Sequence, residues 1–81
     1  SGEINTKLAS MQEVPKRLAA IEAQYTDATL AHLDGLSVDY ADWHFNVRPS
    51  NTEPLLRLNL EATSPEMMEK KRDEVLALIR T

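Results

Sequence analysis

Residues 43–62 carry the sequence WHFNVRPSNTEPLLRLNLEA, in which two alternating stretches flank a polar connection that contains two prolines. The apolar members of both stretches occupy every second position: Trp43, Phe45 and Val47, then Leu56, Leu58, Leu60 and Ala62. Because successive side chains of a β-strand point to opposite faces, this alternation predicts two antiparallel strands with one apolar and one polar face. A sheet of that kind is covered on one side only.

A hairpin is predicted upstream of this stretch. Asp34-Gly35 separates Thr29–Leu33 from Leu36–Tyr40, and glycine adopts the positive φ of a tight turn without steric strain. A second tight turn at Ala41-Asp42 leads into the strand that starts at Trp43. The middle of the chain is therefore expected to contain three or four antiparallel strands.

Amphipathic helices are predicted on both sides of the strands. Ser10 and Glu13 fit a capping box at the start of a helix from about Met11 to Tyr25, and Ser64 and Pro65 suit the first turn of a second helix. Apolar residues recur at helical spacing: Met11, Val14, Leu18, Ile21 and Tyr25, then Met68, Val75, Leu76 and Ile79. The predicted fold class is α+β, a two-layer sandwich in which an antiparallel sheet of about four strands carries two helices on one face.

Length and composition narrow the class of protein. The 81 residues, of which 42% are hydrophobic and 27% charged, are expected to form one domain that spans residues 1–81. The absence of cysteine excludes a disulfide framework, a thiolate metal site and a cysteine nucleophile. No apolar run approaches the roughly 20 residues that cross a membrane, so we expect a cytoplasmic protein without a membrane partner. The net charge of −4 argues against nucleic acid as a partner.

The connection Arg48–Pro54 is longer than the roughly two to five residues of a plain hairpin loop. Ser50, Asn51 and Thr52 place side-chain donors beside backbone N–H groups, and in a tight turn such groups can converge on an anion. Arg48 adds a planar guanidinium group that matches two phosphate oxygens. These residues predict a phosphate-binding loop. The alternative is a surface turn in which Ser and Thr cap local backbone groups.

Neighbouring charged residues are assigned structural roles. Glu53 is expected to pair with Arg48 or Arg57 or to accept loop N–H groups, since a carboxylate beside a phosphate site is repulsive. For Arg57 we favour a surface ion pair over a phosphate contact. Lys70-Lys71-Arg72 lies among acidic residues and is expected on a solvated helix face.

Histidines and aromatic residues are also assigned to surface and core. His32 and His44 have no second ligand at the spacing of a metal site, so a surface position is expected for both. Trp43 and Phe45 share the alternation of Val47, which favours the core over a stacking platform for a base.

The residues around the loop resemble a known family. The run Arg48-Pro49-Ser50-Asn51-Thr52-Glu53-Pro54-Leu55-Leu56-Arg57-Leu58, followed by Glu61-Ala62, is similar to the C-terminal domain of the α-D-phosphohexomutases, which include phosphomannomutase and phosphoglucomutase. Other characteristic segments of that domain are similar to Ser1-Gly2-Glu3-Ile4-Asn5 and Leu33-Asp34-Gly35-Leu36. The resemblance covers nearly the whole chain. It implies a TATA-box-binding-protein-like fold and the fourth, last domain of an isomerase.

The resemblance also implies roles for the loop. Arg48, Ser50 and Thr52 would contact oxygens of the substrate phosphate that is not being transferred, and Asn51 would contribute mainly its backbone N–H. A phosphoserine in the first domain would give its phosphoryl group to the sugar, and a bisphosphate intermediate would link hexose 6-phosphate to hexose 1-phosphate.

The resemblance implies that the catalytic segments missing from this chain lie in the three other domains of the parent enzyme. It contains no segment that could hold the phosphoserine and no Asp-Gly-Asp-type magnesium loop. Mg²⁺ is therefore expected in another domain, this chain is expected to supply no catalytic residue, and the isolated domain is expected to be inactive.

Two other classes of protein stay open. A stand-alone protein-interaction module with a small α+β sandwich fold would need an exposed apolar patch, which the alternation does not predict. A nucleic-acid binder on a similar sandwich is disfavoured by the acidic balance of the chain.

Overall fold

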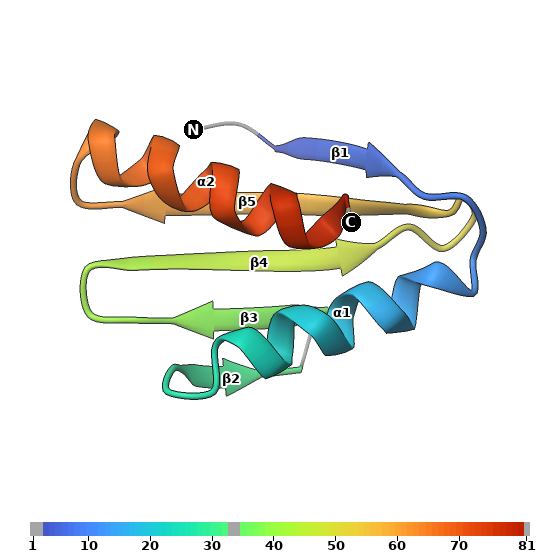
Figure 1. The fold of residues 1–81 in the computed structure, drawn as a ribbon, viewed down its shortest axis with the longest axis horizontal. Helices are drawn as coiled ribbons and strands as arrows, with labels where there is room; N and C mark the ends of the chain where they lie inside the picture. Colours follow the sequence, from blue (N-terminus) through green and yellow to red (C-terminus); the bar gives the residue numbers. More distant parts are fainter. Residues whose placement is uncertain (1–2, 33–34, 81) are drawn as a thin grey trace.

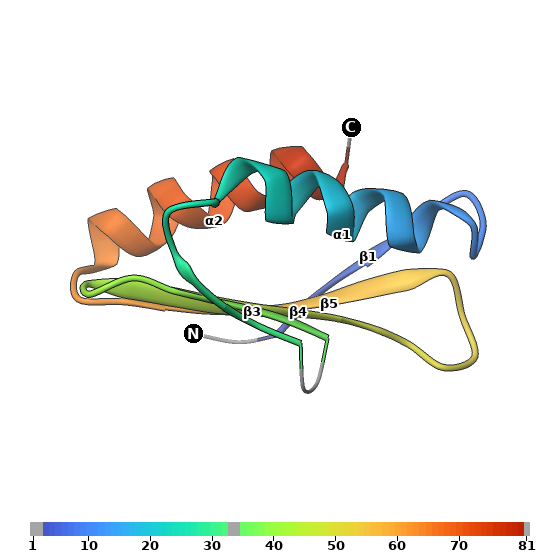
Figure 2. The ribbon, with the colours of Figure 1, turned by 90° about the horizontal axis from the view of Figure 1, so that it is seen from below.

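The computed structural model describes residues 3–32 and 35–80, and within them five strands form one sheet. Along the chain the elements are β1 (Ile4–Lys7), α1 (Glu13–Gln24), β2 (Thr29–Ala31), β3 (Leu36–Asp39), β4 (Trp43–Pro49), β5 (Leu55–Ala62) and α2 (Pro65–Ile79). The strands lie in the order β1-β5-β4-β3-β2, and all neighbouring pairs are antiparallel. Both helices lie on the same face of this sheet (Figures 1 and 2), which confirms the predicted α+β two-layer sandwich.

The sheet has one strand more than the approximate four that the sequence predicts. The additional strand is β1, which pairs with β5 so that Ile4 faces Leu58 and Thr6 faces Leu56. This strand has four residues, and Ile4 is its one strongly apolar member. A stretch so short has too few alternating positions to be distinguished from a loop by sequence pattern. Its pairing depends on β5, which is far away in the sequence.

The first helix starts differently from the prediction. It begins at Glu13 and not at Met11, and Gln12 occupies the N-cap position without a side-chain hydrogen bond. The Glu13 N–H donates to the carbonyl oxygen of Ser10 (3.1 Å), so a backbone turn replaces the expected capping box. Pro15 falls in the first turn, where its missing N–H leaves no helical hydrogen bond unmade.

The second helix begins as predicted. Ser64 is the N-cap, its hydroxyl accepts a hydrogen bond from the Met67 N–H (3.2 Å), and Pro65 follows in the first turn. Its buried residues, Val75, Leu76 and Ile79, belong to the predicted stripe, whose fourth member Met68 is partly buried. The core lies between the helices and the apolar face of the sheet, and its buried members are Val14, Ile21, Tyr25, Leu36, Val38, Trp43, Phe45, Val47, Leu56, Leu58, Leu60, Val75, Leu76 and Ile79.

Four rings form an aromatic cluster where β4 begins: Tyr25, Tyr40, Trp43 and Phe45. Trp43 stacks between Tyr40 (5.1 Å between centroids) and Phe45 (5.5 Å), and both Trp43 and Phe45 are buried, as the alternation predicts. The Lys71 ammonium lies 4.9 Å from the Trp43 ring, so this lysine covers the cluster and is not simply part of a solvated helix face.

Two hydroxyl groups of this cluster are hydrogen-bonded to carboxylates. The Tyr25 hydroxyl donates to Glu74 (2.8 Å), and the Tyr40 hydroxyl donates to Asp27 (2.6 Å). Burial raises the pKa of Tyr25 above its ordinary value and that of Tyr40 to about 12, and the hydrogen bonds to carboxylates act in the same direction. Both phenols therefore stay neutral far into the alkaline range.

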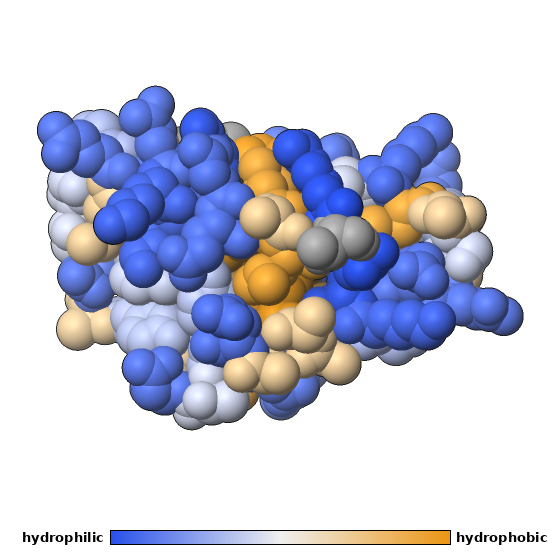
Figure 3. All heavy atoms as spheres, viewed as in Figure 1, coloured by the Kyte–Doolittle hydropathy of each residue, from blue (hydrophilic) through white to orange (hydrophobic). Residues whose placement is uncertain are grey.

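The helical face is not completely polar. Figure 3 shows a strip of hydrophobic surface between the two helices, bordered by hydrophilic side chains. Met11 is the one exposed large hydrophobic residue among those that the structure describes, at 48% exposure, and the partly buried apolar side chains of the helices are Leu18, Met67, Met68 and Leu78. In residues 3–32 and 35–80 no helix combines the length and the apolar character that membrane crossing requires.

Candidate phosphate-binding site

The loop between β4 and β5 is fastened at its base by backbone hydrogen bonds. The Ser50 N–H donates to the Leu55 carbonyl (3.2 Å), and the Leu55 N–H donates to the Glu53 carbonyl (2.8 Å). From the segment after β1, the Leu8 N–H donates to the Pro54 carbonyl (2.6 Å). These bonds and the prolines restrict the loop, so its polar groups are held in one arrangement.

Ser50 organises the interior of the loop. It is the one buried polar residue of the described chain, with 8% exposure. Its Oγ accepts hydrogen bonds from the N–H groups of Thr52 (3.3 Å) and Glu53 (3.4 Å) and lies 3.5 Å from the Thr52 hydroxyl. The local capping that sequence leaves open as the alternative is therefore present.

Local capping and anion binding are compatible in this geometry. A hydroxyl group has two acceptor lone pairs and one donor hydrogen, and the two N–H groups use the lone pairs of Ser50. The hydrogen then points to Thr52 or to a ligand. Within residues 3–32 and 35–80 the Asn51 N–H makes no hydrogen bond, and Asn51 is exposed.

Two arginines lie beside the loop on the open face of the sheet. Arg48 on β4 and Arg57 on β5 are direct cross-strand partners. Their side chains, 42% and 36% exposed, share one hollow of about 250 Å³ with Pro49, Ser50 and Asn51. The structure thus brings Arg48, Ser50 and Asn51 together, while Thr52 contacts Ser50 from outside the lining of the hollow.

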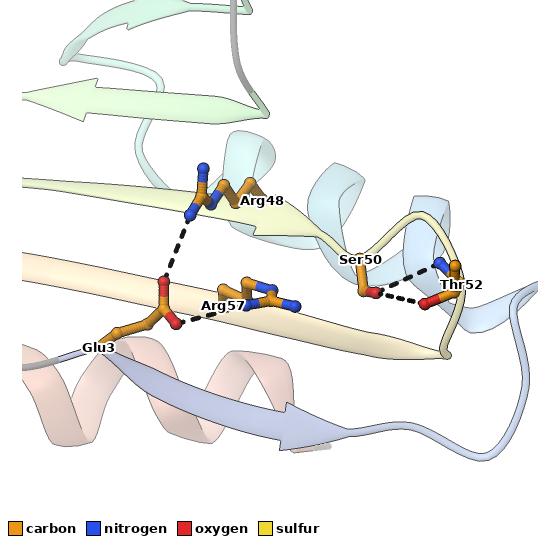
Figure 4. A network of polar contacts seen from close by, with 5 residues as sticks. All are labelled: Glu3, Arg48, Ser50, Thr52 and Arg57. Carbon is orange, nitrogen blue, oxygen red and sulfur yellow. Dashed lines mark hydrogen bonds and ion pairs between the residues drawn. The ribbon is translucent and has the colours of Figure 1, made fainter.

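A single carboxylate contacts both arginines. Glu3, the residue before β1, places one oxygen 3.5 Å from Nη2 of Arg48 and the other 3.6 Å from Nη1 of Arg57. Figure 4 shows Arg48 extending away from Ser50 and toward Glu3, while the Arg57 guanidinium points toward the loop. The surface ion pair expected for Arg57 is confirmed, but its partner was not anticipated.

Sequence reasoning misplaced the partner of the arginines. Among the described residues Glu53 forms no ion pair with Arg48 or Arg57, and its side chain is exposed, although its backbone carbonyl accepts the loop N–H of Leu55. The carboxylate that contacts both arginines is that of Glu3. Sequence reasoning also missed Arg57 as part of the hollow. The register of β4 and β5 could have identified it, because equal alternation places Arg57 opposite Arg48.

Gly35 supports the strand end that carries Arg48. Its φ is +77°, and a Cβ atom there would lie 2.4 Å from the Val47 carbonyl oxygen and 2.7 Å from Cα of Arg48. Only glycine combines this backbone conformation with so close an approach. The pairing of β2 with β3 confirms the predicted hairpin, whereas Leu33 and Asp34 of its turn lie outside the described residues.

The opposite end of β4 and β5 has a second hollow, of about 270 Å³, with a different lining. It includes Trp43, Asp42, Glu61 and His44, and no arginine or lysine. His44 lies 3.6 Å from Glu61, and His32 lies 2.8 Å from Glu22, both on the surface as predicted. The described residues contain no group of three or more His, Asp or Glu that could hold a metal ion.

Residues 3–78 match the family of the phosphoglucomutase/phosphomannomutase C-terminal domain. A phosphomannomutase of Escherichia coli is 46% identical over 99% of this chain. A phosphomannomutase of Methanocaldococcus jannaschii is 43% identical over 98% of it, and a protein named phosphohexose mutases from Xanthomonas campestris pv. campestris is 41% identical over 99%. The chain spans 17–18% of the length of these relatives.

Proposed function

This chain belongs to the phosphoglucomutase/phosphomannomutase family, in which it is a C-terminal domain, and on that premise we propose that its loop binds the phosphate group of a hexose phosphate. The relatives are phosphomannomutases and so belong to a family of isomerases. The parent enzyme would interconvert hexose 6-phosphate and hexose 1-phosphate by intramolecular phosphoryl transfer. This chain would supply binding and positioning, not a catalytic residue.

The observation that carries the proposal is the hollow lined by two arginines and the residues of the fastened loop. Arg48 and Arg57 contribute two positive charges to its wall, and Ser50 and Asn51 contribute neutral donors. A phosphate dianion has three terminal oxygens that accept hydrogen bonds and matches such a set in both charge and geometry. In a chain with a net charge of −4, this local arrangement can attract an anion that the protein as a whole repels.

Each loop residue would have a distinct role toward phosphate. The Asn51 N–H and the Ser50 hydroxyl hydrogen would donate to oxygens at the base of the hollow, and Thr52 would add its hydroxyl after a small rotation. Arg48 would turn from Glu3 toward the loop and bind in a bidentate manner. Neutral donors with few charges suit a phosphate that must bind and then leave within each turnover.

Phosphoryl transfer in the parent enzyme would depend on this remote contact. A phosphoserine in another domain would give its phosphoryl group to the sugar, while this loop holds the phosphate already present. Because phosphoryl transfer is catalysed mostly by positioning and charge stabilisation, binding energy at the unreactive phosphate raises the rate of the reacting one. After the bisphosphate reorients, the same loop would hold the other phosphate, so it would serve both directions.

The parent enzyme is expected to use Mg²⁺ at the reacting phosphate. The described residues of this chain offer no cluster of ligands that fits the ion. The three other domains would carry the magnesium and phosphoserine segments, and the apolar strip between the helices is a surface that they could cover. The isolated chain would bind phosphate without turning over sugar, and the parent would act in the cytoplasm.

A titration of the ¹⁵N-labelled chain with inorganic phosphate and with hexose 6-phosphate tests the proposal. The amide signals of Ser50, Asn51 and Thr52 should shift most, and the dissociation constant should be about millimolar, since one phosphate contact set contributes roughly 4 kcal/mol after association costs. Chloride at matched ionic strength serves as the control for screening.

A matched pair of variants makes the titration specific. Arg48→Ala should weaken phosphate binding severalfold, whereas Arg72→Ala removes the same charge from α2 and should leave the loop shifts unchanged. Shifts that spread over the whole surface, or that centre on Lys70–Arg72, would contradict a phosphate-binding loop.

A further inference from the structure

Glu3 holds together two like charges that the fold places side by side. Arg48 and Arg57 are direct cross-strand partners, and like charges in such positions repel. The carboxylate of Glu3, from the residue before β1, contacts one nitrogen of each guanidinium, at 3.5 and 3.6 Å. The three groups carry a net charge of about +1 instead of the +2 of the arginines alone.

The Glu3 contacts resemble those that a bound anion would make. Each carboxylate oxygen faces one guanidinium, and phosphate oxygens would use the same N–H donors. Figure 4 shows Arg48 drawn toward Glu3 and away from the loop that holds Ser50 and Thr52. The carboxylate therefore lies against Nη2 of Arg48, on the side away from the loop.

We propose that Glu3 is an internal competitor of the substrate phosphate: it holds Arg48 and Arg57 while the site is empty, and phosphate displaces it. This inference rests on the proposed function of the loop and adds a residue that lowers its affinity. It gives the domain a site that exchanges phosphate readily, because the carboxylate returns to the arginines when phosphate leaves.

The local structure allows this displacement. The two contacts are longer than the roughly 2.7–2.9 Å of strong charge-assisted hydrogen bonds, so each is weak. Glu3 precedes the paired residues of β1, whose ladder with β5 starts at Ile4. Its side chain is 31% exposed and can turn into solvent without breaking a hydrogen bond of the sheet. Both arginines remain anchored in central strands.

The direction of the effect follows from the charges. Removal of the carboxylate charge leaves the arginines with a charge of about +2, which attracts a phosphate dianion more strongly and relieves the repulsion between Glu3 and phosphate. At separations of about 6–8 Å with water-like screening, this corresponds to a gain in affinity of about three- to tenfold. A carboxylate that merely oriented the arginines for phosphate would give the opposite result.

The test compares Glu3→Gln with wild type in a phosphate titration of the 81-residue chain at constant ionic strength. Glu61→Gln is the matched control, because it removes an exposed carboxylate from β5 at the other end of the sheet. We expect Glu3→Gln to lower the dissociation constant for phosphate about three- to tenfold, with Glu61→Gln close to wild type. The gain should shrink in 0.5 M salt, since screening weakens the charge effect.

A second readout does not depend on the strength of binding. Without phosphate, Glu3→Gln should unfold at a lower temperature than Glu61→Gln because the arginines then repel, and phosphate should reverse this difference. Equal or weaker phosphate binding by Glu3→Gln, with wild type still binding at the loop, would overturn the role of Glu3 and leave the proposed function intact. Absence of loop shifts in both proteins, with both folded, would overturn the proposed function and this inference with it.

Discussion

The two ends of β4 and β5 contain hollows of similar size, about 270 and 250 Å³, but of opposite character. At the aromatic end, stacked rings fill the core, and the phenol groups donate to Glu74 and Asp27. At the loop end, the guanidinium groups of Arg48 and Arg57 share one carboxylate at 3.5 and 3.6 Å. At one end of β4 and β5, rings and phenol groups are therefore packed and hydrogen-bonded within the domain. At the other end, the charged groups make only long ion pairs.

From this difference we expect the aromatic end to contribute mainly to stability and the loop end mainly to the proposed binding of phosphate. Tightly packed rings contribute to folding because they remove apolar area from water. Weakly paired charges contribute little to folding, since exposed ion pairs are worth about 0–1 kcal/mol. Their donors are accordingly available for exchange with a bound anion. Mutations at the two ends should change different measured quantities.

The largest expected effect is at the aromatic end. Phe45→Ala removes a buried ring that stacks on Trp43 and should lower the free energy of unfolding by about 3–5 kcal/mol. That is a large part of the roughly 4–12 kcal/mol expected for a domain of this length. Urea denaturation followed by Trp43 fluorescence measures it, and Phe45→Leu provides a milder variant if the alanine variant does not fold. A loss below about 1 kcal/mol would contradict the idea that the aromatic end stabilises the fold.

The next effect is at the loop end and concerns activity. Arg48→Ala in the full-length parent enzyme should lower kcat/KM by roughly ten- to several-hundred-fold, because a charge-assisted contact worth about 1.5–3 kcal/mol or more is lost. Both reaction directions should be affected, since the same loop would hold either phosphate. Arg48→Lys should recover only part, as the ammonium lacks the planar fork. If Arg48→Ala turned over both substrates at wild-type efficiency, the loop would not be the site that binds phosphate.

Ser50→Ala should give a smaller effect, on both the stability of the fold and the binding of phosphate. It leaves the N–H groups of Thr52 and Glu53 without their acceptor and should destabilise the fold by about 1 kcal/mol. It also removes the hydroxyl group that we propose donates to phosphate, so binding should weaken beyond what the loss of stability explains. Thermal unfolding and phosphate titration on the same samples separate the two. Normal phosphate binding by a destabilised Ser50→Ala chain would restrict Ser50 to local capping.

The smallest effect concerns alkaline pH at the aromatic end. The pKa of Tyr40 is raised to about 12, so above pH 10 the unfolded chain loses a proton that the folded chain keeps. Stability should therefore fall as the pH rises from about 10 toward 12. Tyr40→Phe should reduce this slope, and the remainder reports Tyr25, whose pKa is raised as well. Urea midpoints at successive pH values measure it; an unchanged slope would mean that Tyr40 ionises normally in the folded chain.

Local sequence patterns predicted most of the fold. The alternation in residues 43–62 identified β4, β5 and the buried positions of Trp43 and Phe45, because adjacent residues on a strand face opposite environments. The pattern around Ser64 identified the start of α2 because its capping hydrogen bond is local. By contrast, β1 was not predicted, since its four residues become a strand only through pairing with β5.

In the candidate site too, the residues close together in the sequence were predicted and those from distant segments were not. Arg48, Ser50, Asn51 and Thr52 could be selected because they are consecutive, or nearly so, in one proline-bounded loop. The Glu3 carboxylate and the tight fit of Gly35 against Arg48 depend on distant segments that meet only in the folded chain. The misassigned pairing of Glu53 has this origin, because proximity in sequence was taken as proximity in space.

The strand order also implies a sequence of events in folding. From β2 to β5 each strand pairs with the next one along the chain, whereas β1 must return to β5 from the opposite end, with Ile4 opposite Leu58. Closing so long a segment is entropically slower than forming hairpins, so β1 is expected to join the sheet late. A short edge strand is also expected to detach first in the native state, and its amides to exchange hydrogen faster than those of β4. Each such opening would carry Glu3 away from Arg48 and Arg57, in addition to the rotations of its side chain within the paired strand.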